Sequence, residues 1–300
     1  EYVPTFEYKI EDVKITKTIC MDYGKNTVGV YYKITNGNKK AKLTIAPIVN
    51  FRDFHSMSTD HIFDVKQKIN GTKVKLEIDG MAKFPVYMNL SEGSYIRHEN
   101  DTFKNMFYIE EQKRGFEPEE NHAVPGRYEI EIEPNEEKEI SFICSTEDNI
   151  EELDARALIM KETVRLHKIF NESMLIDNSK VDEAKDEKEK DELIKTFLLA
   201  TDNFIIKRPL FNTYSAIAGY PWFLDWMRDT LISFEGLFLV TRRFDNAKKV
   251  LQHCIRDIKF GLIPNTYSED DYRPLYNSVD ASLLFFEQVK KYLQYTNNYE

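Results

Sequence analysis

The chain has 300 residues, 42% of them hydrophobic and 13% aromatic, which is enough for two domains with substantial cores. Its formal net charge of −10 argues against nucleic acid and anionic membrane surfaces as partners, because both require basic patches. No apolar run is as long as a membrane span, and no signal-peptide pattern is present.

Residues 1–147 carry the alternating pattern of β-strands. Three pairs of alternating segments, each joined by a polar turn, predict hairpins at 28–45, 65–78 and 127–144. The first two turns contain Asn-Gly, and the third is PNEE. Many short strands joined by polar turns predict an antiparallel β-sandwich.

After residue 147 the pattern becomes helical. The spacing of apolar residues predicts helices at 148–170, 191–207, 230–242, 245–259 and 280–296. No strand pattern appears in this part, so we expect a β-sandwich domain, a helical linker and an all-α domain, at 1–147, 148–190 and 191–300. The chain begins in strand-like alternation and stops just past a helical pattern, so we expect a segment of a longer protein.

The stretch YPWFLDWMRDTLIS (220–233) gathers both tryptophans of the chain with three charged residues: Trp222, Trp226, Asp225, Arg228 and Asp229. The following helix is apolar nearly all round and is expected inside the domain, so these charges need partners. Indole faces stack on sugar rings, and Asp and Arg form paired hydrogen bonds with neighbouring hydroxyls. The residue types suit a polyol site. The alternatives are that Asp229 only caps the helix and that the tryptophans only fill the core.

A second candidate stretch, GLIPNTYSEDDYRPLYNSVDASLLFFEQV, places Asp280 directly before an amphipathic helical pattern. On this pattern alone, Asp280 is a helix N-cap. The six histidines are scattered without ligand spacing, so we expect no metal and no other cofactor. The three cysteines are odd in number and widely spaced, which suits reduced thiols in a cytoplasmic protein.

In their order along the chain, these stretches resemble the amylo-α-1,6-glucosidase part of glycogen debranching enzymes. That family shows A-G-[YL]-P-W-F…W-[GM]-R-D-T, then G-L-I-P-N and Y-N-x-x-D-A, and this chain has AGYPWFLDWMRDT, GLIPN and YNSVDA. In the β part, LTIAPIVNFRDFHSMST (43–59) and YIEEQKRGFEPEENHAVPGRYEIEI (108–132) resemble the N-terminal domain of bacterial and archaeal relatives. The match is poor around 61–105 and 173–190. The resemblance implies a β-sandwich followed by a truncated (α/α)6 barrel of the six-hairpin glycosidase type.

The resemblance also implies roles for the site residues. Asp280, which stands where glucoamylases have Glu, is the general acid, and the general base lies on a later helix beyond residue 300. The pKa of Asp280 must then be raised, by burial or by nearby Asp229. The substrate-binding residues are Trp222, Asp225, Trp226, Arg228, Asp229, Asn265 and Tyr276.

The implied function is the inverting hydrolysis of α-1,6-linked glucose at branch points of glycogen-like α-glucans. Inverting enzymes hold two carboxylates roughly 6.5–9.5 Å apart, so that a water molecule fits between one of them and the sugar. The alternatives are a related (α/α)6 glucosidase acting on trehalose-like or short α-gluco-oligosaccharides, and a carbohydrate-binding relative without turnover. A second carboxylate in the site favours hydrolysis over binding alone.

Overall fold

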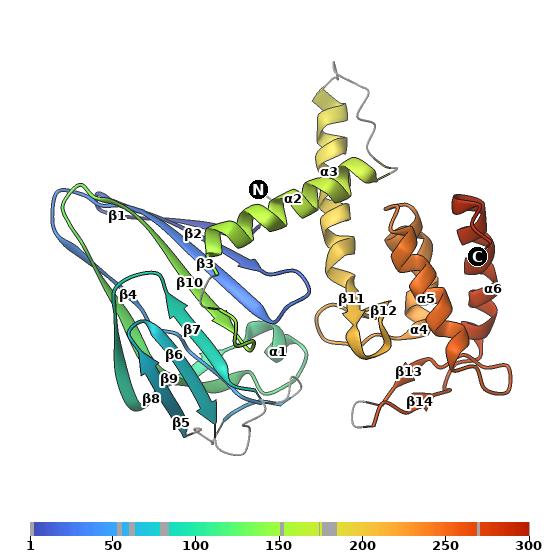
Figure 1. Ribbon diagram of the computed structural model, residues 1–300, viewed down its shortest axis with the longest axis horizontal. Coiled ribbons are helices and arrows are strands. Elements are labelled where there is room, and N and C mark those ends of the chain that lie inside the picture. The colour runs from blue at the N-terminus through green and yellow to red at the C-terminus, as the bar shows by residue number, and fades with distance from the viewer. Residues whose placement is uncertain are drawn as a thin grey trace. The chain divides into compact units, whose positions relative to one another are not determined.

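Figure 1 shows the computed structural model, which describes residues 3–52, 56–59, 64–78, 84–150, 153–173, 175, 185–268 and 271–299. The chain divides into two compact units, Glu1–Thr163 and Val164–Glu300. The division falls inside helix α2 (Ala155–Glu172), which lies within the range 148–190 that was predicted to be a helical linker. Within the described ranges, no helix combines the length and the apolar character needed to cross a bilayer.

The first unit is a sandwich of two antiparallel sheets, as predicted. The large sheet has the order β1-β2-β3-β10-β7-β6-β5, and its strands are β1 (Thr5–Ile10), β2 (Val13–Met21), β3 (Thr27–Thr35), β10 (Glu137–Ser145), β7 (Val86–Leu90), β6 (Lys73–Ile78) and β5 (Val65–Asn70). The small sheet consists of β4 (Ala41–Ile45), β9 (Glu119–Ile132) and β8 (Ser94–Phe107), in that order. Helix α1 (Ile109–Lys113) lies between β8 and β9 in the chain.

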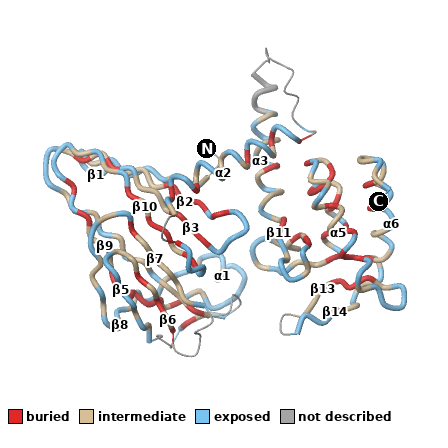
Figure 2. Tube along the Cα trace, viewed as in Figure 1, coloured by how far each residue is buried: buried red, intermediate tan, exposed pale blue. Residues whose placement is uncertain are grey.

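The core of the sandwich comes from alternate residues of both sheets, as the alternation of buried and exposed segments along the strands shows in Figure 2. Its buried members include Ile34, Leu76 and Met88 of the large sheet and Tyr128 and Ile130 of the small one. Because successive side chains of a strand point to opposite faces, the alternating sequence pattern identifies these residues as inward-facing.

The predicted hairpin at 65–78 is confirmed, because β5 pairs with β6 from Val65↔Ile78 to Asn70↔Lys73. Gly71 in its turn has φ +60°, a conformation that glycine adopts without strain. The other two predicted hairpins are wrong. Strands β3 and β4 belong to different sheets, and so do β9 and β10, so both turns cross from one sheet to the other.

The two crossover turns are tied to each other by Asn36. Its buried side chain donates hydrogen bonds to the carbonyls of Lys39, 2.8 Å away, and Glu133, also at 2.8 Å. The Asn135 amide donates to the Gly37 carbonyl at 2.7 Å. The Asn-Gly pair at 36–37 therefore lies in a connection between two sheets and does not close a hairpin. The residue that holds Asn36 there, Glu133, is 97 residues away in the chain.

The second unit is mainly helical. Its helices are α3 (Lys185–Phe204), the 3-10 turn η1 (Pro209–Phe211), α4 (Met227–Ile232), the π-helix η2 (Glu235–Leu239), α5 (Phe244–Arg256) and α6 (Asp280–Thr296). The prediction of an all-α domain is wrong, because two small sheets pair β11 (Ile205–Arg208) with β12 (Thr213–Ala216) and β13 (Thr266–Tyr267) with β14 (Pro274–Leu275). Strands of two to four residues are too short to show an alternating pattern.

The predicted helix 230–242 is replaced by α4 and η2, which are separate elements. Leu231, Phe234 and Phe238 of this segment are fully buried and form the centre of the helical core, where α5 and α6 also contribute. The prediction that the segment lies inside is therefore confirmed for these residues, whereas Ile232 is exposed. The helix predicted at 280–296 is confirmed as α6. The complete (α/α)6 barrel stays a prediction.

Candidate active site

The loop between β12 and α4 carries both tryptophans. A β-bridge between Ile217 and Asp225 closes the loop, and the Ala218 amide donates to the Leu224 carbonyl at 3.0 Å. Trp222 and Trp226 are partly buried, and neither belongs to the buried hydrophobic core of the unit. The interpretation that these indoles only fill the core is therefore not supported.

Asp225 is held by an arginine that the sequence analysis did not single out. Arg208 of β11 donates Nε to Oδ2 of Asp225 at 3.1 Å and Nη2 to Oδ1. The Thr266 hydroxyl also donates to the Asp225 carbonyl, at 3.2 Å. These bonds engage both carboxylate oxygens and fasten the tryptophan loop to β11 and β13. No local pattern signals this arginine, which lies 17 residues from its partner.

Asn265 joins the two candidate stretches. The first amides of a helix have no partner within the helix, and Trp226 at the N-cap of α4 supplies no side-chain acceptor. Asn265 accepts these bonds instead, through Oδ1 from the Arg228 amide at 2.9 Å and through its carbonyl from the Met227 amide at 2.6 Å. Its Nδ2 donates to Oδ1 of Asn277 at 3.1 Å. Asn265 is only 5% exposed, and its hydrogen bonds connect the N-terminus of α4 to the segment before α6.

Arg228 and Asp280 form an ion pair across the two stretches. Nε of Arg228 lies 2.5 Å from Oδ2 of Asp280, 52 residues further along the chain, and each side chain is 48% exposed. Arg228 is not enclosed in the domain, although the segment after it was expected inside, because α4 turns Met227 and Leu231 toward the core and leaves Arg228 outside it. The tertiary structure nevertheless brings together the two residues to which the resemblance assigns substrate binding and proton donation.

Asp280 is not the N-cap of α6. The helix begins at Asp280, its N-cap is Val279, and no side chain forms the usual cap bond there. Ser278 has the capping contact instead, because its Oγ accepts from the Ala281 amide at 3.3 Å and donates to Oδ1 of Asp280 at 2.5 Å. Serine shortly before a helical pattern is a common capping signal, so Ser278 was identifiable from the sequence, but the capping prediction was made for Asp280.

The Asp280 carboxylate is stabilised in its ionised form. The hydrogen bond from Ser278 and the ion pair with Arg228 lower the pKa of Asp280 below its usual value of 3.8. The same pair raises the pKa of Arg228. The expectation of a raised Asp280 pKa is therefore wrong for this state of the protein, because the carboxylate is half-exposed and has two donors instead of an apolar surround.

The two remaining predicted site residues, Asp229 and Tyr276, differ in their hydrogen bonding. Asp229 lies in the first turn of α4, where a negative charge is favourable, and it is not the cap residue. Its carboxylate has no hydrogen-bond partner within the described residues. Tyr276 donates its hydroxyl to the Asp257 carbonyl at 2.7 Å, which anchors the segment before α6 to the end of α5. In the described part of the chain, no group of three or more His, Cys, Asp or Glu side chains is arranged to hold a metal ion.

Comparison with known proteins connects both units to one family. Residues 1–139 match the family described as glycogen debranching enzyme N terminal, and residues 199–300 match amylo-alpha-1,6-glucosidase. The glycogen debranching enzyme of Saccharomyces cerevisiae is 38% identical over 87 residues, which cover 27% of this chain and 6% of the yeast protein.

Two solved structures resemble the whole chain weakly. A putative kojibiose phosphorylase from human microbiome has 11% identity and a TM-score of 0.43 over 98% of this chain and 41% of its own. A bacterial glucoamylase complexed with acarbose has 14% identity and a TM-score of 0.40 over 98% of this chain and 48% of its own. The chain thus spans a small part of the curated relative it matches and less than half of these two structures.

Proposed function

We propose that this chain, which belongs to the glycogen debranching enzyme family, forms the β-sandwich and the glucose-binding part of a glycosidase that removes α-1,6-linked glucose from glycogen-like α-glucans. The observation that carries the proposal is the Arg228–Asp280 ion pair, 2.5 Å long, beside the carboxylate of Asp229. A planar guanidinium and two carboxylates at an accessible position suit the paired hydroxyls of a terminal glucose. Trp226 is the N-cap residue of α4, directly before this pair's arginine helix, and indole is a side chain that packs on the apolar face of a sugar ring.

In the proposed mechanism, glucose binding changes the protonation of Asp280. The sugar hydroxyls compete for the Arg228 guanidinium, and loss of the ion pair removes one of the interactions that keep the pKa of Asp280 low. The bound substrate covers the Asp280 carboxylate and excludes water from it, and this desolvation raises the pKa of Asp280 further. Asp280 then binds a proton and donates it to the leaving glycosidic oxygen as the bond to the anomeric carbon breaks.

The finer parts of the proposal are the inverting outcome and the (α/α)6 barrel. Inversion requires a second carboxylate that activates water on the opposite face of the sugar. Asp229 is not assigned this role, because it lies one residue from Arg228 and is proposed to bind hydroxyls. The anomeric form of the first glucose released, followed by proton NMR, tests the outcome directly, since inversion of an α-linkage yields β-glucose.

The substrate class is tested by initial rates of glucose release from a phosphorylase limit dextrin, panose, maltose and trehalose. The proposal expects the limit dextrin, and then panose with its α-1,6 bond, to be the best substrates. Preference for trehalose or maltose would favour a related glucosidase instead. Binding of a glucose-like inhibitor without release from any of the four would favour a carbohydrate-binding protein.

A further inference from the structure

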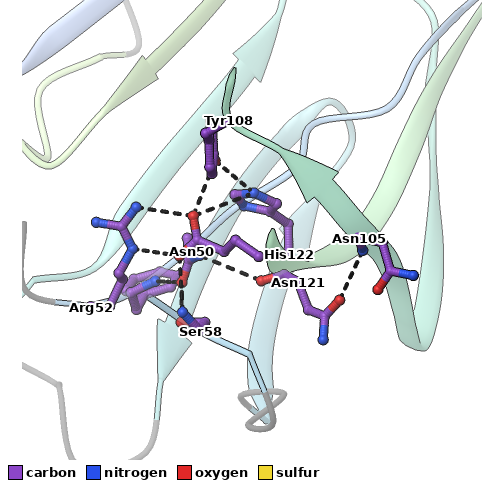
Figure 3. A network of polar contacts seen from close by, with 9 residues as sticks. Asn50, Arg52, Ser58, Asn105, Tyr108, Asn121 and His122 are labelled. Carbon is purple, nitrogen blue, oxygen red and sulfur yellow. Dashed lines mark hydrogen bonds and ion pairs between the residues drawn. The ribbon is translucent and has the colours of Figure 1, made fainter. Parts of the chain in front are cut away.

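The β-sandwich contains a buried polar network that includes none of the candidate active-site residues. Glu120 of β9 is only 1% exposed. Arg52 donates Nε to its Oε1 at 2.5 Å and Nη2 to its Oε2 at 3.0 Å. The Ser58 amide donates to Oε1 and the Tyr108 hydroxyl to Oε2, each at 3.0 Å. Figure 3 shows Arg52, Ser58, Tyr108 and His122 converging in this network.

The Glu120 carboxylate acts as a fixed anchor and not as a free ligand. Burial opposes its ionisation, but the bonds from Arg52, the Ser58 amide and Tyr108 outweigh burial and lower the pKa of Glu120 to about 2. Each oxygen of the Glu120 carboxylate accepts two hydrogen bonds, so both lone pairs of each oxygen are already used. Replacing a whole buried ion pair by apolar side chains often costs little stability, whereas removing one partner is costly, so the role of this pair includes holding its neighbours in place.

The network positions the neighbouring residue, Asn121. The Asn121 amide donates to the Ser58 carbonyl at 2.8 Å, and its side-chain Nδ2 donates to the Thr59 carbonyl. Its Oδ1 accepts from the Asn105 amide at 3.0 Å. Asn105 lies in an irregularity of β8 between Phe103 and Met106 and has φ +57°, in the left-handed region that asparagine tolerates. The segment around Thr59 and the irregular part of β8 are thus held against the same side chain.

A cavity of about 540 Å³ opens at this place, and the lining residues that the structure describes are polar: Thr59, Asn105, Glu117, Glu119, Glu120 and Asn121. The side chains of Asn105, Glu117 and Glu119 have no hydrogen-bond partner within the described residues. Two amides, one hydroxyl and carboxylate acceptors therefore border one hollow, which is within the size range of small-molecule sites.

The lining favours a neutral polyhydroxyl ligand over an ion. The Glu117 and Glu119 carboxylates repel an anion. A metal ion is disfavoured because Arg52 already neutralises Glu120. Sugar hydroxyls can donate to the Glu117 and Glu119 carboxylates while accepting from the Asn105 and Asn121 amides, so every partner type in the cavity is used.

We propose that this cavity is a second carbohydrate-binding site, in which a neutral α-glucan chain is held by the amides of Asn105 and Asn121 and the carboxylates of Glu117 and Glu119. The polyhydroxyl character follows from the lining alone, whereas the assignment to α-glucan rests on the proposed function. Such a site would keep a polymeric substrate attached to the protein independently of the glucose subsite.

The test is calorimetric titration of maltoheptaose into the chain carrying Arg228→Ala, which weakens the candidate glucose subsite and leaves the cavity intact. Asn105→Gly removes the amide and keeps the left-handed backbone accessible. We expect it to lower the association constant at least about five-fold, as loss of hydrogen bonds to a ligand does. Asn135→Gly is the matched control, because Asn135 is also an exposed asparagine of the sandwich, at φ +59°, and does not line the cavity. Its association constant should stay unchanged.

Equal binding by the Asn105→Gly and Asn135→Gly proteins, or no binding of maltoheptaose at all, would overturn the proposal. Equal affinity for cellohexaose would overturn the assignment to α-glucan, and calcium binding that Glu119→Gln abolishes would replace the sugar by a cation. Glucose release is measured separately. Loss of release with intact Asn105-dependent binding would contradict only the proposed function, and release without such binding would contradict only this inference.

Discussion

Replacing Glu120 by Gln should destabilise the sandwich by an amount that the structure allows us to estimate. The substitution keeps the size of the side chain and removes the charge around which Arg52, the Ser58 amide and Tyr108 are arranged. The pKa of Glu120 falls from 4.5 to about 2 on folding. That fall corresponds to on the order of 3 kcal/mol of unfolding free energy contributed by the ionised form at neutral pH.

The pH dependence of this contribution has a definite sign. Because folding lowers the pKa of Glu120, the contribution is complete above about pH 4.5, declines as the pH falls from there, and is lost below about pH 2. The difference in stability between the wild-type and Glu120→Gln proteins should therefore shrink as the pH falls from 5 toward 2. Other carboxylates titrate in both proteins and largely cancel in this difference.

Urea unfolding can assign the effect to the correct unit. Both tryptophans lie in the second unit, so their fluorescence reports on that unit, whereas amide hydrogen exchange of peptides from the sandwich strands, measured by mass spectrometry at each urea concentration, reports on the first unit. We expect the exchange transition of the sandwich peptides to move to lower urea and the fluorescence transition to stay in place. Glu119→Gln is the control, because its exposed side chain should change stability by less than about 0.5 kcal/mol. A loss below about 1 kcal/mol for Glu120→Gln, or a difference that does not vary with pH, would refute the reasoning.

Three further predictions concern the second unit. Asp280→Asn should lower turnover by on the order of 10²–10⁴-fold, and less for α-glucosyl fluoride, because the amide has no proton to transfer; limit-dextrin rates within a few-fold of wild type would exclude Asp280 as the acid. Arg228→Lys should raise the KM or lower the kcat strongly while the Tm stays unchanged, because Lys lacks the planar fork of donors; normal kinetics would return Arg228 to a structural role. Asn265→Ala should cost about 2 kcal/mol in urea unfolding followed by tryptophan fluorescence, because it removes the side-chain bonds to α4 and Asn277; an unchanged midpoint would contradict this connecting role.

The sequence pattern was sufficient wherever a feature depends on residues close together in the chain. The hairpin of β5 and β6 follows from alternation around one Asn-Gly turn, and α6 follows from the spacing of its apolar residues. The sandwich core and the family resemblance also follow from local patterns, repeated along the chain. Arg228 and Asp280 could be named as candidates because each lies within a recognisable stretch.

What the pattern could not supply is the choice of partners. The alternation of β3 and β4 is the same whether they pair with each other or with strands of different sheets, and long-range pairing decided it. Three features of the site each depend on a residue distant in the chain: the exposure of the Arg228–Asp280 pair, the lowered pKa of Asp280, and the ion pair of Arg208 with Asp225. The charge of each side chain and the periodicity of apolar residues can be read from the sequence. Desolvation and ion pairing arise only when folding brings distant segments into contact.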